Sequence, residues 1–323
     1  MSTENLQPVA PVGEAEEVVA RSITNVRTTP FSDKYSIQEL QKLNLITTPK
    51  DTPLLTKLLA KGSVKSASWL FEWNESPLST NFTGAVYDGY DISVVDESNG
   101  TPSRQSNHIM AVAQIARVGG LAQSFETVEG NAMNLEVQQK YLHLLRCIEY
   151  FLWNGNFGSD NKQTDGVVTL VTTAVANGGV ALVETKLDEA IVAVIDAGLQ
   201  PTDIWASPTV CARIANFAKN RIQYFNTVEA ENGIGQKGFM YNTPFGYTIN
   251  VNPVRTDFLP ATTAFVLDMS LVTLRHSGDA VVQSQALPVV NDGQAILFKS
   301  YFGLELKNKA KHRTITGITE ALA

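Results

Sequence analysis

The stretch ETVEGNAMNLEVQQKYLHLLRCIEYFLW, residues 126–153, carries the strongest indication of secondary structure in this chain. Its apolar residues recur at intervals of three and four, the spacing of one buried helical face. They are Val128, Ala132, Leu135, Leu142, Leu145, Ile148 and Leu152. Glu126 and Glu129 favour a helix start because the macrodipole is positive there, and Gly155 favours the end. At about 1.5 Å per residue the helix spans roughly 40 Å, so we expect a long spine.

The segment before this helix is predicted to form a two-stranded excursion, in which the chain leaves in one extended stretch and returns in another. The first shows a period of two, which predicts a strand with Lys65, Ala67, Trp69, Phe71 and Trp73 on one face. Turn residues follow as far as Pro102, and a second extended stretch returns over 104–120. Because an isolated hairpin is only marginally stable in water, we expect this excursion to rest on other structure.

The excursion has an unusually large aromatic content. Its aromatic residues are Trp69, Phe71, Trp73, Phe82, Tyr87 and Tyr90. An ordinary strand that packs on its own core would explain them. A projecting excursion favours the alternative that they are subunit-interface anchors, because aromatic side chains dominate contact energetics.

Downstream of the spine, the pattern alternates between strands and helices. The uncharged run 166–183, broken by Asn177-Gly178-Gly179, predicts a hairpin. Residues 185–197 predict a helix that is capped by the pair Thr185 and Asp188 and ended by Gly198. A short strand at 204–206 precedes a helix that Ser207-Pro208 would open, with Val210, Ile214 and Phe217 on its inner face.

The last third of the chain shows strand periodicity throughout. The alternating sets are Phe245, Tyr247, Ile249 and Val251, then Phe265, Leu267, Met269 and Leu271, then Ile296, Phe298, Phe302, Leu304 and Leu306. Together with the helices, these sets predict the α+β class.

The N-terminal segment differs from the rest. Residues 1–30 are rich in Pro, Ala and Glu without sustained apolar periodicity, which is typical of an arm without a core. Short helical stretches follow over 36–45 and 51–59. No basic region with an apolar run begins the chain, so a secretory signal is not expected.

The composition excludes several classes of protein. The chain has 323 residues, 44% of them hydrophobic and 18% charged, with a net charge of −7. A basic nucleic-acid binder is excluded, because neutralising phosphates needs clustered Lys and Arg. A free monomer of this size carries more charge, so part of the surface is expected to meet other protein. Two cysteines cannot make a disulfide framework and suit a reducing, cytosolic compartment.

No motif predicts catalysis, a cofactor or a metal. Gly233–Gly238 matches G-x-G-x-x-G but lacks the flanking strand and helix that a dinucleotide site needs. Asn161, Gln163 and Asp165 resemble the start of a calcium loop, whose twelfth position is Thr172 where Glu is required. His143 and Cys147 share a helix face, but two ligands do not make a zinc site. We assign no catalytic, cofactor-binding or metal residue.

The order of these parts resembles the major capsid proteins of tailed bacteriophages, the Hong Kong 97-type fold. The similar stretches are Asp51–Leu55 with the strand 62–73, Arg104-x-x-Asn107 through Gly119-Gly120, Thr243–Arg255 with Leu259-Pro260 and Val266–Asp268, and Tyr301–Ile318. The resemblance covers residues 35–318.

The resemblance implies a domain organisation. The N-terminal arm would be 1–50 and the extended loop 62–112, lying over the adjacent subunit. The peripheral domain would comprise 113–155 and 261–323 around the spine helix 126–153. The axial domain, around the symmetry axis of each capsomer, would be 156–260.

The resemblance also implies a function: a structural subunit of an icosahedral phage head rather than an enzyme. It would assemble in the bacterial host cytoplasm into hexamers and pentamers of the virion capsid. Its partners would be further copies of itself, a portal, and a scaffold or cement protein where one is used, with no membrane. It would enclose double-stranded DNA without specific binding, and the net charge of −7 suits such a wall.

Three alternatives stay open on the sequence. An encapsulin-type compartment shell has the same fold but encloses enzymes. An α/β enzyme would use the middle domain, with Cys147 or the 233–238 loop as its site. A tail or decoration protein is the third.

Overall fold

The computed structural model describes residues 52–77, 88–89, 91, 100–124, 132–217, 222–223, 239–288 and 292–319. All of them belong to one compact unit, formed by 46–127 and 131–323. The predicted arm 1–50 lies outside the described residues. Phe82, Tyr87, Tyr90 and the loop Gly233–Gly238 do so too.

The helices are α2 (Pro53–Lys61), α3 (Gly120–Ser124), α4 (Ala132–Asn154), α5 (Val167–Leu170), α6 (Glu184–Asp196) and α7 (Pro208–Phe217), with the short 3₁₀ turns η2 (Met269–Leu271) and η3 (Lys309–Lys311). The strands are β1 (Val64–Lys65), β2 (Leu70–Glu75), β3 (Ser103–His108), β4 (Met110–Val118), β5 (Ala174–Val180), β6 (Asp203–Ala206), β7 (Ile222–Gln223), β8 (Phe239–Asn242), β9 (Thr248–Pro253), β10 (Ala264–Leu267), β11 (Val272–His276), β12 (Val282–Ala286), β13 (Gln294–Leu306) and β14 (Arg313–Ile318).

These strands form three sheets. A seven-stranded sheet has the order β5-β14-β10-β6-β9-β8-β7. A five-stranded sheet has the order β1-β11-β13-β12, and β4 pairs with β13 on its other side. The third sheet is the pair β2-β3. Mixed helices and sheets confirm the predicted α+β class.

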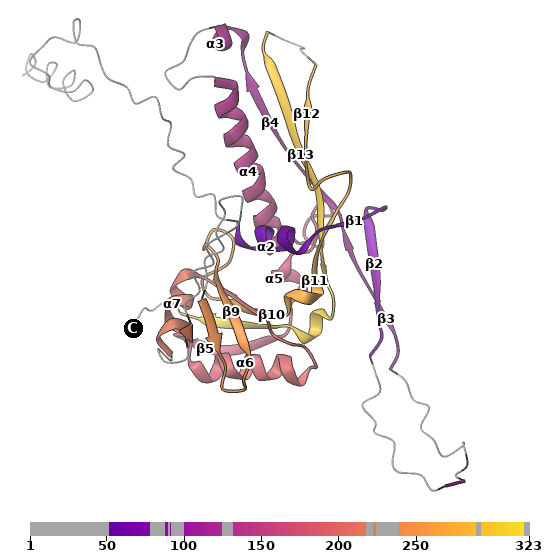
Figure 1. Ribbon diagram of the computed structural model, residues 1–323, viewed down its shortest axis with the longest axis vertical. Coiled ribbons are helices and arrows are strands. Elements are labelled where there is room, and N and C mark those ends of the chain that lie inside the picture. The colour runs from indigo at the N-terminus through magenta and orange to yellow at the C-terminus, as the bar shows by residue number, and fades with distance from the viewer. Residues whose placement is uncertain are drawn as a thin grey trace, which may run out of the picture. The chain divides into compact units, whose positions relative to one another are not determined.

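The predicted spine is α4, a helix of 23 residues that packs along β4 and β13 (Figure 1). The predicted first turn, 126–131, lies outside the described residues. Ile148 and Leu152 are fully buried as expected, and so is Leu144, which the periodicity missed. The fully buried position on this part of the helix is therefore Leu144, one residue before the predicted Leu145.

The seven-stranded sheet is covered on both faces, and all residues of β6 and β10 are buried. Ile204 and Val266 belong to the core that α6 and α7 complete. Trp205 and Phe265, on the opposite face, belong to the core that contains Trp153 of α4. The rings of Trp153 and Trp205 meet edge to face, with centroids 5.8 Å apart. The sheet is therefore the middle layer between two sets of helices.

Strands from distant parts of the sequence meet in this sheet. β10 and β14 come from beyond residue 260, so the predicted axial region 156–260 does not contain the whole sheet. The division into peripheral and axial domains stays a prediction.

The hairpin predicted over 166–183 is wrong. Val167–Leu170 form the single turn α5, because Val167 and Leu170 are buried in the core beside α4. Only 174–180 form a strand, and β5 pairs in parallel with β14. Gly178 and Gly179, with φ of 78° and 74°, lie at an irregularity in this pairing rather than at a hairpin turn.

The helix predicted over 185–197 exists, but its predicted cap is wrong. α6 begins at Glu184, so Thr185 lies inside the helix, and Val183 is the N-cap without a side-chain hydrogen bond. The predicted end is confirmed by Gly198, with φ of 84°. For α7, the predicted cap Ser207 accepts a hydrogen bond from the amide of Val210 at 3.4 Å.

Two of the predicted alternations run too far. Phe245 is 49% exposed in the turn between β8 and β9, where Thr243 closes on Tyr247. Met269–Leu271 form η2 instead of continuing β10. The long alternation from Ile296 to Leu306 is confirmed by β13, which spans 13 residues.

The helices in the described part of the chain include none long and apolar enough to cross a membrane.

Candidate subunit interface

The excursion predicted before the spine is a ribbon of β2 and β3, paired antiparallel. In this register Phe71 lies opposite Asn107, and Glu75 lies opposite Ser103. Residues opposite one another point to the same face. The ribbon therefore has an inner face, with Phe71, Trp73 and Glu75, and an outer face, with Glu72 and Arg104.

The predicted single face from Lys65 to Trp73 is interrupted. Val64 and Lys65 form β1, which pairs with β11, and the chain bends before β2 begins at Leu70. Ser66 holds this bend, because its amide donates to the His276 carbonyl at 2.8 Å and its hydroxyl donates to the Ser68 carbonyl. The bend separates Trp69 from the face that Phe71 and Trp73 share.

The described aromatic residues of the ribbon have different surroundings. Trp69 is 63% exposed, and its ring lies tilted against that of His108, with ring centroids 4.8 Å apart. His108 stacks in turn on Phe157 at 3.7 Å. Phe71 is only 7% exposed and Trp73 is partly buried. Of these three predicted interface anchors, Trp69 alone presents most of its side chain to solvent.

The ring of Phe71 packs against β13 at Gly303, which has no side chain. A Cβ added at Gly303 would lie 2.8 Å from Cε1 of Phe71 and 2.6 Å from the His108 carbonyl oxygen. Any side chain at Gly303 would therefore displace the ribbon. The Arg275 guanidinium covers the ring of Phe71 at 5.9 Å from its centroid.

Asn107 fixes the second strand of the ribbon and is fully buried. Its Nδ2 donates to the carbonyls of Leu304 at 2.7 Å and Asp165 at 3.0 Å. Its Oδ1 accepts from the amides of His108 and Asp165. The amide group is satisfied by partners on three segments of the chain, as a buried polar group requires.

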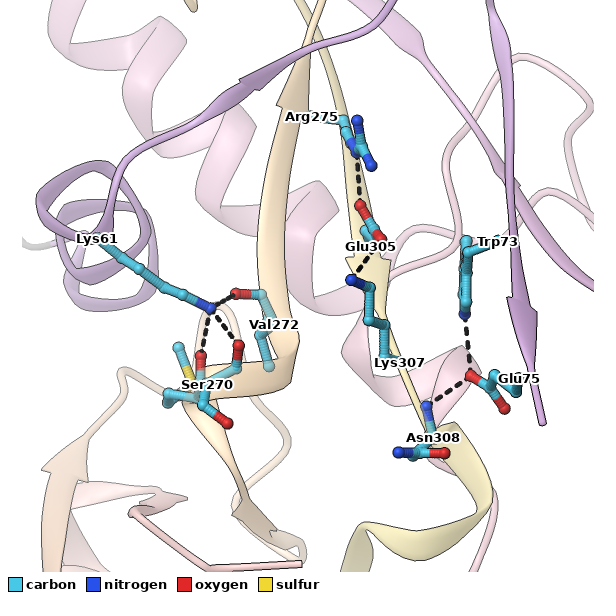
Figure 2. Close-up of polar contacts among 10 residues, drawn as sticks. Lys61, Trp73, Glu75, Ser270, Val272, Arg275, Glu305, Lys307 and Asn308 are labelled. Carbon is cyan, nitrogen blue, oxygen red and sulfur yellow. Dashed lines mark hydrogen bonds and ion pairs between the residues drawn. The ribbon is translucent and has the colours of Figure 1, made fainter. Parts of the chain in front are cut away.

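Glu75 makes the outermost contact of the ribbon with the body (Figure 2). Its Oε1 accepts from the backbone amide of Asn308 at 2.6 Å and from Nε1 of Trp73 at 2.9 Å. Asn308 has φ of 54°, in the left-handed region that Asn tolerates better than most residues. The carboxylate thus satisfies an amide in the turn that leads from β13 to β14.

Figure 2 also shows two further groups of polar contacts, one at Lys61 and one at Glu305. The Lys61 ammonium donates to three carbonyls, of Met269, Ser270 and Val272, at 2.6 to 2.8 Å. Burial lowers the pKa of Lys61 from its usual value. The Glu305 carboxylate, 2% exposed, accepts from Nε of Arg275 at 2.5 Å and lies 3.5 Å from the Lys307 ammonium.

The five-stranded sheet is covered by α4 on one face only (Figure 1). Met110 and Phe302 point into the core that contains α4. On the other face Ile115 lies opposite Leu297, and Ala113 opposite Lys299. Ile115 is 46% exposed. The ribbon covers this face at Gly303, and β12 adds Gln283 and Gln285 at its edge. We call the β4 and β13 residues that the ribbon leaves uncovered, Ala111, Ala113, Ile115, Arg117, Ala295, Leu297, Lys299 and Tyr301, the open face.

The open face has an unusual composition for an exposed surface. Its charged residues are Arg117 and Lys299, and it contains no acidic side chain. The rest is apolar or aromatic. Exposed apolar area rimmed by charge is typical of protein contact surfaces.

The cysteines do not have the properties of nucleophiles. Burial raises the pKa of the Cys147 thiol and raises the pKa of Cys211 to about 12. A thiol with a raised pKa is a poor nucleophile. Cys147 lies 3.7 Å from Nε2 of His143, and no group of three His, Cys, Asp or Glu side chains among the described residues is placed to hold a metal.

The sequence reasoning missed three residues of this region. Gly303 could have been found, because a glycine inside a strand often marks close backbone approach. Asn107 and Glu75 carry no local signal, since their partners are 197 and 233 residues away in the sequence.

A second missed group holds α2. The Glu149 carboxylate, fully buried on α4, accepts from the amides of Leu54 and Leu55 at 3.1 and 2.8 Å and from Nε1 of Trp153. It satisfies amides at the first turn of α2, where no intrahelical acceptor exists. Lys57 of the same helix pairs with Asp203 of β6.

The fold resembles solved capsid and shell structures along most of its length. The cyanophage A-1(L) capsid has a TM-score of 0.61 at 12% identity, with 89% of this chain and 98% of that chain covered. A Mycobacterium phage Bobi structure has a TM-score of 0.56 at 15% identity, covering 87% and 95%. An encapsulin complex of Synechococcus elongatus has a TM-score of 0.55 at 12% identity, covering 94% and 96%. These likenesses confirm the predicted Hong Kong 97-type fold.

A search of the curated proteins found no match. The family model described as SU10 major capsid protein matches residues 23–319, which is most of the sequence. This match agrees with the likeness in fold to solved capsid structures. The chain belongs to the SU10 major capsid protein family.

Proposed function

We propose that this capsid protein is the structural subunit of an icosahedral phage head, that it assembles into hexamers and pentamers, and that it has no catalytic role. The observation that carries the proposal is that one subunit has both an anchored ribbon and an open face. The ribbon shares no sheet with the body, and the open face has no helix over it within the described residues. Each feature needs a partner to be covered.

A second copy of the chain is the partner that these features fit. The loop between β2 and β3, residues 76–102, contains Asp88, Asp91, Asp96 and Glu97 and no Lys or Arg. The open face carries Arg117 and Lys299 and no acidic residue. We infer that the loop of one subunit lies over the open face of its neighbour, with Trp69 as an apolar anchor at the ribbon base. Opposite charge would fix the register of the two surfaces.

The same reasoning extends to the contents of the shell. A chain with 25 Lys and Arg against 32 Asp and Glu gives a wall that attracts phosphate only weakly. We infer that packaged double-stranded DNA is enclosed without specific binding. We also propose that the shell assembles in the host cytoplasm. It contacts a portal, and a scaffold or cement protein where one is used.

An encapsulin-type shell is the second candidate, because an encapsulin covers 94% of the chain in structure. The family match favours the phage head. Identifying the enclosed material separates the two: nuclease-resistant DNA in particles from infected cells supports the head, and an enclosed enzyme supports the compartment.

The assembly proposal is tested by negative-stain electron microscopy of the purified full-length chain. We expect closed particles. The double variant Arg117→Glu with Lys299→Glu should lose them, because it reverses the charge that faces the acidic loop. Lys162→Glu, a charge reversal in the polar loop before α5, is the matched control and should assemble normally. A monomer or dimer for the wild type under every condition would contradict the proposal.

A further inference from the structure

We propose that Glu75 is a positioning residue that sets the direction of the ribbon before any neighbour is bound. This inference rests on the proposed assembly of subunits through the ribbon. It concerns a property of the single subunit, however, and that property can be measured without shells.

Besides its covalent connections to β1 and β4, the ribbon contacts the body at two places that the argument uses. The inner place is the opposed pair Phe71 and Asn107, which fits against Gly303 and bonds the Leu304 carbonyl. The outer place is Glu75, which accepts from the Asn308 amide. Glu75 lies four positions along the strand from Phe71, which is roughly 13 Å.

The inner place and the two covalent connections fix the base of the ribbon. They leave its outer end, four residues further along β2, free to bend away from the body. The Glu75 contact removes that freedom, because it lies at the far end of β2. A hydrogen bond to an ionised carboxylate is also among the stronger ones available.

The partner of Glu75 is suited to this role. Asn308 lies in the turn between β13 and η3, and its left-handed conformation directs its amide out of the strand ladder. The next residues of the turn lead to His312, which is fully buried. His312 bonds the Asp268 amide through Nδ1 and the Lys307 carbonyl through Nε2. Glu75 therefore binds a turn that is itself fixed between the two large sheets.

The opposite face of the same strand offers a matched control. Glu72 pairs with Arg104, and both residues belong to the ribbon. Removing the Glu72 carboxylate takes a charge and an ion pair from the ribbon without touching its attachment to the body. Glu72→Ala and Glu75→Ala therefore each remove one carboxylate from β2, and only Glu75→Ala removes the contacts with Asn308 and Trp73.

The test measures a distance between ribbon and body by double electron–electron resonance. Spin labels are placed at Thr101, beyond the end of the ribbon, and at Asp196, at the end of α6, in a Cys147→Ser background. Cys211 is buried with its pKa raised to about 12 and does not compete for the label. Labelled subunits are diluted into unlabelled ones, so that only distances within one chain contribute.

We expect Glu75→Ala to fold with a cooperative thermal transition, to broaden the distance distribution, and to lose regular particles in micrographs. Glu75→Gln retains an acceptor oxygen and should keep a narrow distribution. Glu72→Ala should match the wild type in all three measurements. If Glu75→Ala does not fold, Glu75→Ser, whose hydroxyl is too short to reach Asn308, takes its place.

An unchanged distribution in Glu75→Ala would overturn the proposal. Equal broadening in Glu72→Ala would overturn it too, because the integrity of the ribbon would then be the cause. A wild type that forms no particles would contradict the proposed function only, since the distances are measured within one subunit.

Discussion

The seven-stranded sheet and the five-stranded sheet belong to one chain, but helices cover both faces of the first and one face of the second. Trp205 and Ile204, neighbours on β6, are both fully buried because helices cover both faces of their sheet. On β4 of the other sheet, Ala116 is fully buried while Ile115 is 46% exposed. The first sheet is complete within the subunit, and the second is half covered.

The difference explains where the chain places its charge. A subunit that is finished by its neighbours needs apolar surface where they bind, and charge there would oppose association. The open face follows this pattern in part, because six of its eight residues are apolar or aromatic and its two charged residues, Arg117 and Lys299, are both basic. Four substitutions test this difference between the sheet that is covered on both faces and the sheet that is covered on one.

The largest effect is expected in the completed sheet. Trp205→Ala should lower the free energy of unfolding by about 3–5 kcal/mol, because it empties a site that Trp153 and Phe265 surround. Urea denaturation of the subunit measures this loss. A loss under about 1 kcal/mol would mean that this face of the sheet is not a packed core.

A smaller loss is expected where the ribbon meets β13. Gly303→Ala should destabilise the subunit by about 1–3 kcal/mol, because the new methyl group overlaps Phe71 and the His108 carbonyl. Gly119→Ala is the control, since a Cβ there meets nothing within 4 Å. The difference in unfolding midpoint between the two variants measures how closely the ribbon packs on β13. Equal midpoints would refute this close packing.

The junction between the two sheets should respond to pH through His312. Burial lowers the pKa of His312 below its ordinary value, so the folded chain binds this proton less readily than the unfolded chain. Stability is then complete above pH 6.5 and declines as the pH falls, by at most about 1.4 kcal/mol per pH unit for one proton. Asp268, Arg313 and Glu75 are the charged groups around the ring, and the Lys307 carbonyl is its hydrogen-bond partner.

Unfolding midpoints between pH 7.5 and 5.5 test this dependence. The wild type should lose more stability over this interval than His312→Asn, which cannot take up the proton. Parallel curves for the two proteins would show that other groups cause the acid sensitivity.

The smallest effect on the subunit is expected on the open face. Ile115→Ser should change the free energy of unfolding by no more than about 0.5 kcal/mol, as is usual for an exposed position. Particle yield should nevertheless fall, because the side chain lies at the proposed contact with the neighbour. A variant that is destabilised but assembles normally would place Ile115 in the core of the subunit instead.

The sequence predicted the elements whose signals are local. The 3-and-4 spacing predicted α4, the period of two predicted β13, and Gly198 predicted the end of α6. In each of these the residues that carry the signal are near neighbours in the chain. The cap at Thr185 failed because α6 begins one residue earlier, at Glu184, with Val183 as its N-cap.

The remaining errors share one cause. Val167 and Leu170 have strand propensity, but the core beside α4 holds them in a helical turn. Phe71 and Trp69 alternate in sequence as if on one face, but a bend bonded to His276 separates them. Such contacts join residues far apart in the chain, so no window of sequence contains both partners.

The sequence by itself determined the order of the parts, the long spine, the α+β class and the shortage of charge, because composition and periodicity are properties of single segments. Tertiary structure alone decided that Glu75 and Asn107 anchor the ribbon, that Glu149 holds α2, and that one sheet is left open on one face. Each of these depends on which distant segments meet, and only the folded chain brings them together.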